Sequence, residues 1–176
     1  TTNKLLPTET PYYQELYPDF YAPQALNLTE YSENTIYLTF DDGPSPRTPE
    51  VLQILREKDV KATFFVVGTA KLEYLPKIAE KGHTIGLHSN THRYNEIYKS
   101  TDAYFKDLGA ISDKVFNATG VRSKVIRFPG GGSNAISKKI CKGIMTRLTN
   151  QVRIKGYAYF DWNVDGRDAS SARNSK

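Results

Sequence analysis

Apolar runs and amphipathic stretches alternate along the chain from residue 34 onward. Runs rich in β-branched and aromatic residues are typical of buried strands, and they predict strands at residues 35–40, 62–67, 83–87, 125–128 and 157–160. Apolar positions at helical spacing predict helices between the strands, at residues 50–58, 72–81, 101–119 and 137–152. Strands that alternate with helices indicate an α/β fold with a parallel sheet or a (β/α) barrel.

The first 33 residues have a different pattern, rich in proline, tyrosine and acidic groups. Prolines at positions 7, 11, 18 and 23 disfavour a long helix there. We interpret residues 1–33 as an N-terminal arm or linker that packs its tyrosines on the domain, with an aromatic glycan-binding strip as the alternative. The length of 176 residues fits one domain, which we place at residues 34–176.

Composition narrows the classes of site and partner. The single cysteine, Cys141, excludes an internal disulfide framework and any metal site built on several thiolates. The net charge of +5 is spread along the chain without a basic stripe or a known reader motif, so we expect no nucleic-acid partner. No apolar stretch approaches the roughly 18 residues of a membrane span, and we expect none.

Polar groups follow four of the five predicted strands. Strand 35–40 leads into Asp41-Asp42-Gly43-Pro44, and strand 83–87 into His88-Ser89-Asn90-Thr91-His92. Arg127 belongs to strand 125–128, which leads into Pro129-Gly130-Gly131-Gly132, and Asp161-Trp162 follow the last strand. Active sites of βα folds are built at the carboxyl ends of the strands. The distribution therefore predicts an enzyme.

The spacing of these residues suits a metal site. His88 and His92 are four positions apart, so both imidazoles can face one point in a helical turn or tight loop. One added carboxylate gives a two-histidine, one-carboxylate site with open positions. Adjacent aspartates point in different directions from a strand end, so one can bind an ion while the other acts as a base. Each motif also has a simpler explanation, since Asp-Asp-Gly-Pro is a good turn sequence and His-x-x-x-His alone is a weak motif.

Together these motifs resemble the polysaccharide deacetylases, also called the NodB-homology domain or carbohydrate esterase family four. The resemblance rests on residues 39–44 and 88–92, then on Arg127-Phe128-Pro129 and Asp161-Trp162, in the order of the family's motifs. It covers roughly residues 34–168 and is strongest to bacterial peptidoglycan N-acetylglucosamine deacetylases. It implies a distorted (β/α) barrel that hydrolyses the N-acetyl group of an amino sugar.

The resemblance also implies a role for each residue. Asp42, His88 and His92 would hold a divalent ion, which we expect to be zinc, with cobalt, nickel, manganese or iron as alternatives. Asp41 would be the general base, oriented by Arg127, and Asp161 would orient the family's general-acid histidine. The segment Pro129-Gly130 would present the Gly130 N–H to the oxyanion, without the tyrosine side chain that many members have there. Trp162 would line the groove.

The chain differs from the family in having no counterpart of the general-acid histidine. The only other histidine, His83, lies at the start of its strand, so we expect a structural role for it. A (β/α) barrel takes about 250 residues and rarely fewer than 200, so we expect the chain to lack the closing strands and the acid. We therefore expect this piece to bind metal but to deacetylate weakly or not at all.

The leading hypothesis is a metal-dependent N-deacetylase of a cell-wall glycan, with peptidoglycan N-acetylglucosamine as the favoured substrate. The alternatives are a deacetylase of chitin-type or other bacterial polysaccharides and a non-catalytic glycan-binding module on the same barrel. We expect a monomer that works outside the cell or at its surface. Cys141 is predicted to be buried on a helix, and Tyr94 and Tyr98 can either flank a sugar groove or pack in the core.

Overall fold

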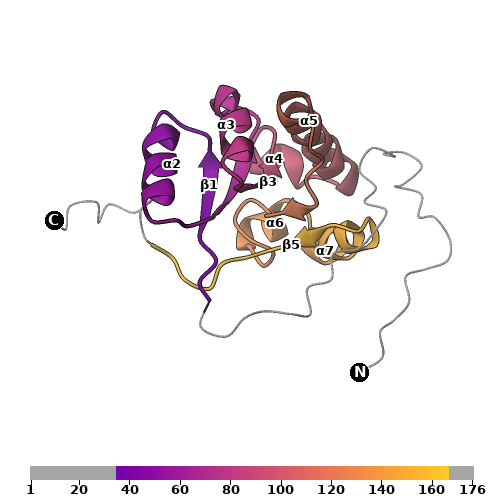
Figure 1. Cartoon of the computed structure of the whole chain (residues 1–176). Coiled ribbons are helices and arrows are strands. Elements are labelled where there is room, and N and C mark those ends of the chain that lie inside the picture. The colour runs from indigo at the N-terminus through magenta and orange to yellow at the C-terminus, as the bar shows by residue number, and fades with distance from the viewer. Residues whose placement is uncertain (1–34, 167–176) are drawn as a thin grey trace.

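The computed structural model describes residues 35–166, which form a five-stranded parallel sheet with helices between the strands (Figure 1). The strands are β1 (Thr39–Gly43), β2 (Thr63–Val67), β3 (Thr84–Ser89), β4 (Val125–Ile126) and β5 (Ala158–Tyr159). Neighbours in sequence are also neighbours in the sheet, and every pair is parallel. The predicted α/β fold is confirmed, whereas the predicted arm at residues 1–33 lies outside the described residues.

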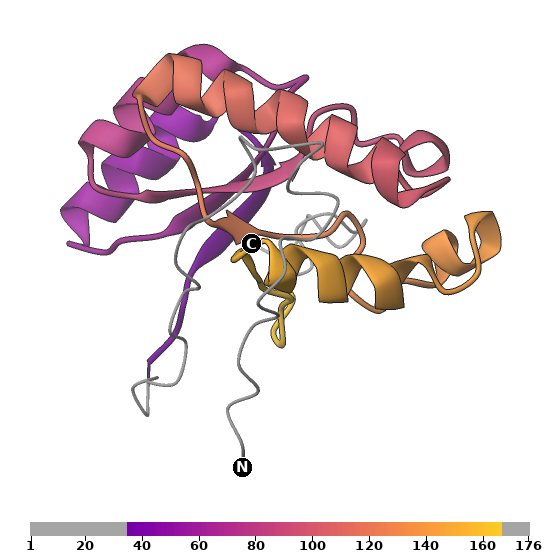
Figure 2. The same ribbon diagram turned by 90° about the vertical axis from the view of Figure 1, so that its right-hand side faces the viewer.

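Helices connect each strand to the next. They are α2 (Thr48–Glu57), the 3₁₀ turn η2 (Leu72–Tyr74), α3 (Leu75–Glu80), α4 (Tyr94–Ile97), α5 (Thr101–Thr119), α6 (Ala135–Ile140) and α7 (Ile144–Ile154). Figure 1 and the turned view in Figure 2 show them following one another around the strands, from α2 through α3 and α5 to α7. Sequential parallel strands with helices outside them are the arrangement of consecutive βα units in a (β/α) barrel.

Helix α5 shows how local sequence sets an element. The Ser100 side chain accepts a hydrogen bond from the Ala103 N–H, which caps the start of the helix. Gly120 ends it in the left-handed conformation that glycine adopts without strain. Between these caps, apolar residues at helical spacing pack into one core with the buried strands β2 and β3, among them Phe105, Leu108 and Ile111. The predicted bounds 101–119 are confirmed.

The first strand begins later than predicted. Residues 35–38 precede the sheet, and Ile36 and Tyr37 are 91% and 71% exposed rather than buried. Pairing with β2 begins only at Thr39, opposite Thr63, and continues through Asp41 into the turn. The strand is therefore Thr39–Gly43. The apolar run in the sequence includes both the start of this strand and the residues that precede it.

The predicted helix at residues 137–152 is wrong as a single element. Helix α6 ends at Ile140, and α7 begins after Gly143, which has a positive φ of 77°. Cys141 lies in this break and is half-buried, with its Sγ 3.2 Å from the Arg147 guanidinium, so the predicted buried helical thiol is also wrong. The apolar spacing continues across the break, but the glycine provides a local turn that ends one helix and starts another.

Three smaller differences concern element ends. The predicted helix 72–81 begins as the 3₁₀ turn η2 before α3. The short helix α4 was not predicted, and it lies directly after the second histidine of the His-x-x-x-His motif. Strand β4 has only two residues, so Arg127 follows it rather than belonging to it. Each difference lies near a polar loop at the end of a strand.

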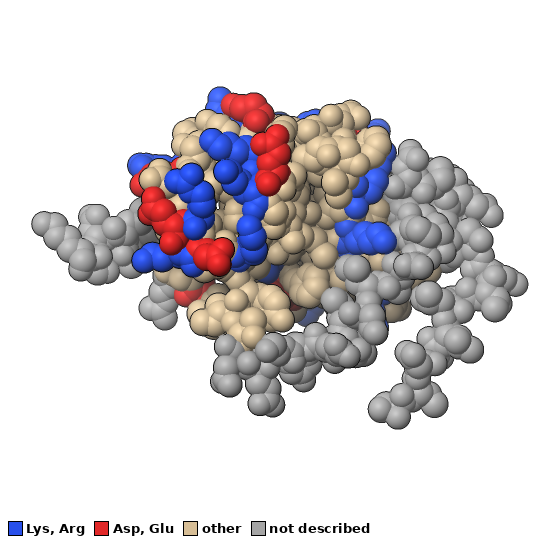
Figure 3. All heavy atoms as spheres, in the orientation of Figure 1, with Lys and Arg blue, Asp and Glu red and all other residues tan. Residues whose placement is uncertain are grey.

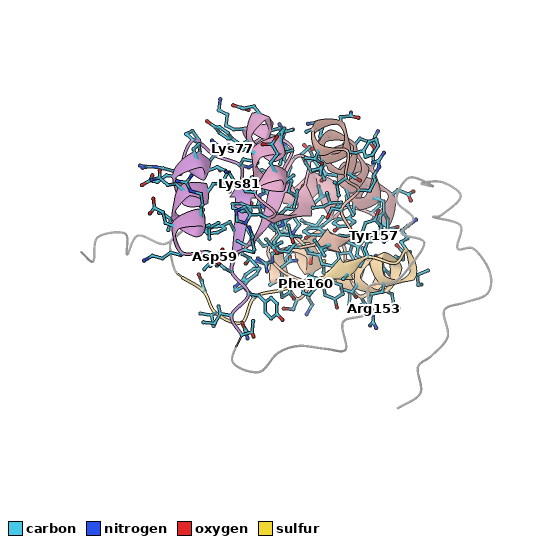
Figure 4. The ribbon with its side chains drawn as sticks, in the orientation of Figure 1. Asp59, Lys77, Lys81, Arg153, Tyr157 and Phe160 are labelled. Atoms are coloured by element: carbon cyan, nitrogen blue, oxygen red, sulfur yellow. The ribbon has the colours of Figure 1, made fainter. Side chains whose placement is uncertain are left out.

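The face drawn in Figure 3 has no large patch of one charge, because acidic and basic side chains alternate over α2 and α3. A groove of about 430 Å³ there is lined by Glu50 as well as Arg56, Lys77 and Lys81. Figure 4 places Lys77 on α3 and Lys81 directly after it, away from Tyr157 and Phe160 beside β5. None of the helices within residues 35–166 is long and apolar enough to cross a membrane.

Candidate metal centre and active site

The two adjacent aspartates at the end of β1 face different partners. Asp41 lies 2.7 Å from the Arg127 guanidinium through its Oδ1 atom. Asp42 has a positive φ of 63°, a conformation that a residue with a side chain rarely adopts, and its carboxylate faces His88 and His92. The prediction that the two aspartates diverge is confirmed, and the strained backbone at Asp42 gives each carboxylate a separate direction.

Asp42, His88 and His92 bring three ligand atoms together. The Asp42 Oδ1 atom lies 3.4 Å from Nε2 of His88 and 3.3 Å from Nε2 of His92. The three ligand atoms all lie within 4.8 Å of one another. These side chains come from β1, from the end of β3 and from the loop after it, so the sheet positions the set that the sequence predicted.

The environment of His88 fits a cation between these side chains. Its Nδ1 atom lies 2.7 Å from the Arg127 carbonyl oxygen, and this contact requires the proton to sit on Nδ1. Burial lowers the pKa of His88, which favours the neutral imidazole. A neutral ring protonated at Nδ1 points an Nε2 lone pair at the Asp42 carboxylate. Two electron-rich atoms that face each other are stabilised by a positive ion, so the donor set fits a divalent metal.

The loop that contains His92 is held by hydrogen bonds to Asp107 on α5. The Asp107 carboxylate accepts hydrogen bonds from Ser89 Oγ at 2.6 Å and from the Asn90 N–H at 2.7 Å. It also accepts from the Thr91 N–H and from Thr91 Oγ1, at 2.9 and 2.8 Å. The His92 N–H in turn donates to Ser89 Oγ at 2.9 Å. These bonds stabilise the positive φ of 57° at His92 and fix its ring beside Asp42.

Arg127 connects β1, β4 and the segment after β5. Its guanidinium donates to Asp41 Oδ1, to Thr39 Oγ1 at 2.8 Å and to the backbone carbonyls of Phe160 and Asp161 at 3.0 and 3.2 Å. Its buried side chain lies over the Phe65 ring, 4.2 Å from the centroid. Five contacts leave the guanidinium little freedom, so it fixes the orientation of the Asp41 carboxylate.

The Phe65 platform under Arg127 depends on a glycine. A Cβ added at Gly86 on β3 would lie 2.4 Å from the Phe65 ring, closer than real atoms approach. Glycine at this position therefore lets Phe65 lie against β3 and support the guanidinium from below. Packing several residues away from the aspartates thus contributes to their geometry.

The loop after Arg127 meets the segment after β5. Asp161 Oδ1 accepts a hydrogen bond from the Gly132 N–H at 2.8 Å, so this carboxylate fixes the glycine loop. Trp162 is half-exposed, and its ring centroid lies 5.7 Å from the Arg127 guanidinium. Pro129 is buried in the same loop, and Gly130 has a positive φ of 77°. Each residue predicted at the strand ends therefore lies at this one edge of the sheet.

The two tyrosines at the ends of α4 differ. Tyr98 is fully buried, and its hydroxyl donates to the Pro129 carbonyl at 2.7 Å, so it packs in the core. Tyr94 is half-buried, and its ring lies edge-on to the His92 ring, with 5.4 Å between centroids. Of the two roles that the sequence left open, Tyr98 takes packing, and Tyr94 lies at the edge of the site.

Comparison with known proteins identifies the family. The sequence model of the family described as polysaccharide deacetylase matches residues 29–147. The chain belongs to the polysaccharide deacetylase family. The catalytic domain of a peptidoglycan N-acetylglucosamine deacetylase from Eubacterium rectale is 43% identical in sequence with a TM-score of 0.78, over 84% of this chain and 67% of that one. These figures agree with the α/β fold described above.

Curated relatives of the family give the same result. A peptidoglycan-N-acetylglucosamine deacetylase of Bacillus cereus is 33% identical over 151 residues, which are 84% of this chain and 51% of the relative. A chitooligosaccharide deacetylase of Bradyrhizobium is 33% identical over 139 residues, which are 76% of this chain and 58% of the relative. The chain thus spans about half the length of the curated relatives it matches.

One residue that supports the candidate site was not predicted from the sequence. Asp107 holds the loop between the two histidines, yet it lies 16 to 18 residues from its partners. A signal was present, because Asp107 lies three residues after Tyr104 and four before Ile111, both on the buried face of α5. A carboxylate on the apolar face of a helix needs hydrogen-bond partners, and here the partners are the metal-site loop.

Proposed function

We propose that the chain is the metal-binding catalytic part of an N-deacetylase that acts on a cell-wall glycan. One observation supports this most directly: Asp42, His88 and His92 converge on one point, while Asp41 beside them is held separately by Arg127. A binding module would need neither a separate ion site nor a second, fixed carboxylate. Metal-assisted hydrolysis of an acetamide uses both.

The proposed cofactor is a divalent ion held by Asp42, His88 and His92. Two imidazoles and one carboxylate suit zinc, and cobalt, nickel, manganese and iron accept the same ligands. When bound, such an ion polarises a carbonyl oxygen and lowers the pKa of a coordinated water. In this proposal the residues of the chain position the ion, the water and the acetamide relative to one another.

Asp41 is the proposed general base. Arg127 holds one oxygen of its carboxylate, and the side chain is 29% exposed. The second oxygen can therefore accept a proton from the attacking water, while the guanidinium prevents the carboxylate from turning toward the metal ligands. The new C–O bond forms at the acetamide carbon, and the C–N bond to the sugar nitrogen breaks.

The proposed oxyanion contact is the Gly130 N–H, which forms no hydrogen bond with any of the residues 35–166. Pro129 and Gly130 lie in the loop that Asp161 holds, and Trp162 lines the opposite side. A backbone donor of this kind contributes about 10²–10³ in kcat. Glycine retains that N–H although it adds no side chain.

Release of the sugar amine needs a proton donor. The chain has three histidines, of which two are the proposed ligands, while His83 lies at the opposite end of β3. A general acid contributes about 10²–10⁴ in rate. We therefore expect the 176-residue chain to release acetate slowly, and the proposed role of Asp161 in orienting an acid stays a prediction.

Peptidoglycan N-acetylglucosamine is the proposed substrate. The similarity to peptidoglycan N-acetylglucosamine deacetylases supports it, and the similarity to a chitooligosaccharide deacetylase supports chitin-type oligomers as the alternative. Both substrates carry the same acetamide, so the proposed chemistry is the same for both. A cell-wall substrate implies action outside the cell or at its surface, and we propose that the protein acts there as a monomer.

Acetate release tests this proposal. The full natural protein, loaded with zinc, is incubated with peptidoglycan and with N-acetylglucosamine oligomers, and acetate is measured enzymatically. We expect zinc-dependent release that is faster from peptidoglycan. Faster release from the oligomers would favour the alternative substrate, and the absence of acetate from any N-acetylated glycan, with zinc bound, would overturn the deacetylase function.

A further inference from the structure

Tyr94 lies between the metal-ligand loop and the loop that contains Gly130. Its ring packs edge-on against His92, and a Cβ added at Gly130 would lie only 3.0 Å from the Tyr94 hydroxyl and 3.1 Å from its ring. Since glycine has no Cβ, the phenol end of Tyr94 occupies the space that a side chain at position 130 would need. The ring therefore lies beside the backbone N–H proposed for the oxyanion.

Tyr94 is also held in place from behind. The Tyr98 ring packs against it, with 5.8 Å between centroids, and the Tyr98 hydroxyl is fixed on the Pro129 carbonyl. The Tyr94 hydroxyl, by contrast, forms no hydrogen bond with any side chain or backbone group of the described part of the chain. A rigid aromatic ring thus presents an unused donor at the edge of the site.

We propose that Tyr94 is a substrate-binding residue of the acetamide pocket, and this rests on the deacetylase function proposed above. Its ring forms the wall that closes the pocket on the Gly130 side. Its hydroxyl donates a hydrogen bond to the acetamide oxygen, next to the donor at Gly130, because the Tyr94 ring lies against His92 and its hydroxyl lies beside Gly130. A phenol hydroxyl is a known type of donor to such an oxygen.

Binding measured by fluorescence tests this role without relying on catalysis. Trp162 is the only tryptophan of the chain and lies against the Gly131 side of the same loop, so its emission reports occupancy of the site. The zinc-loaded chain is titrated with the trisaccharide of N-acetylglucosamine and with the trisaccharide of glucosamine, which lacks the acetyl groups. The variants are Tyr94→Phe, which loses only the hydroxyl, and Tyr94→Leu, which also loses the aromatic wall.

We expect Tyr94→Phe to weaken binding of the acetylated trisaccharide about fivefold, the effect of one neutral hydrogen bond, and Tyr94→Leu to weaken it further. Binding of the glucosamine trisaccharide should not change in Tyr94→Phe. Tyr74→Phe, a half-buried tyrosine in η2, is the matched control and should bind both sugars as the wild type does. Zinc affinity and thermal unfolding temperature of Tyr94→Phe and Tyr74→Phe should equal the wild-type values, since both variants keep the aromatic ring.

The outcomes separate this inference from the proposed function. Wild-type affinity for the acetylated trisaccharide in both Tyr94 variants would overturn the role of Tyr94 and leave the deacetylase function standing. An equal loss for both trisaccharides would overturn the acetamide contact. If the zinc-loaded wild type gives no response to the acetylated trisaccharide and releases no acetate, the proposed function fails together with this inference.

Discussion

Strand β3 has a histidine at each end, and the two differ in what their nitrogens contact. His83, just before the strand, accepts a hydrogen bond from the Ala62 N–H at 3.3 Å through Nδ1. His88, at the other end, has its Nδ1 against the Arg127 carbonyl, and its Nε2 faces Asp42. Both side chains are buried, and burial lowers the pKa of both.

The comparison shows that burial alone does not make a histidine functional. The environment at His83 uses the lone pair of Nδ1 for a backbone N–H and packs the ring edge-on against Phe64. At His88 the backbone contact takes up the proton-bearing nitrogen and leaves a lone pair beside two more ligand atoms. A buried histidine therefore suits a structural role where its lone pair meets a donor, and it suits the proposed role of metal ligand where its lone pair meets other acceptors.

The largest expected effect is on catalysis, and it distinguishes the proposed base from the proposed metal ligands at the His88 end of β3. Asp41→Asn should lower acetate release by the full natural protein by about 10²–10⁴, because the amide cannot accept the proton of water. Zinc affinity should stay at the wild-type value, since Asp41 faces Arg127 rather than the two histidines. The matched control is Asp59→Asn at the turn after α2, which should retain activity. Unchanged acetate release in Asp41→Asn would remove Asp41 as the base.

Removal of a proposed metal ligand should abolish tight zinc binding. Asp42→Ala deletes the carboxylate that faces both imidazoles, so zinc affinity measured by calorimetry should fall by more than about 100-fold, beyond the range of outer-sphere changes. His83→Phe, at the other end of β3, should bind zinc as the wild type does. Equal losses in the two variants would contradict the distinction between the two ends of the strand.

A smaller effect is expected when the support of the ligand loop is weakened. Asp107→Asn replaces a carboxylate that accepts four hydrogen bonds with a group that has one acceptor oxygen. We expect zinc affinity to fall about 10–100-fold, as for other residues that orient metal ligands. Asp113→Asn on the same helix, whose carboxylate pairs with Arg122 away from the loop, is the control. A loss of stability in Asp107→Asn with unchanged zinc affinity would show that Asp107 supports only the fold.

The smallest expected effect is on stability, at the His83 end of β3. His83→Phe keeps an aromatic ring against Phe64 but leaves the buried Ala62 N–H without its acceptor, which costs about 1–3 kcal/mol of unfolding free energy at pH 7.5. Because the folded-state pKa of His83 is lowered, the unfolded state binds a proton first as the pH falls. The contribution of His83 to stability is therefore complete above about pH 6.5 and decreases below it.

Denaturant unfolding of the wild type and His83→Phe across pH 4.5–8, at one zinc concentration, measures this dependence. The difference between the two proteins should shrink on acidification, since they differ only in the side chain at position 83. A difference that grows as the pH falls would contradict the assignment of a neutral His83 in the folded protein.

Local sequence signals predicted the elements that they control. Ser100 and Gly120 set both ends of α5, so its bounds could be predicted from the sequence. The start of β1 could not, because Ile36 and Tyr37 have the composition of a strand, and only pairing with β2 decides where the strand begins. Gly143 interrupted a helix whose apolar spacing continued unbroken.

In the candidate site, too, some features could be predicted from the sequence and others depend on tertiary contacts. Its ligands could be predicted because parallel strands align their carboxyl ends, which brings Asp42, His88 and Arg127 to one edge regardless of side-chain detail. The contacts that support the ligands are tertiary. Asp107 approaches its loop from α5, and Tyr94 meets Gly130 across 36 residues, so neither role has a signature within a short stretch of sequence.

Anomalous diffraction at the zinc edge, from crystals of the chain grown with zinc, tests the central claim most directly. We predict a strong peak enclosed by the Asp42 carboxylate and by Nε2 of both His88 and His92, with none at His83. A peak bound through Nδ1 of His88, a peak that includes Asp41 in place of Asp42, or no peak at this edge of the sheet at saturating zinc would contradict the account.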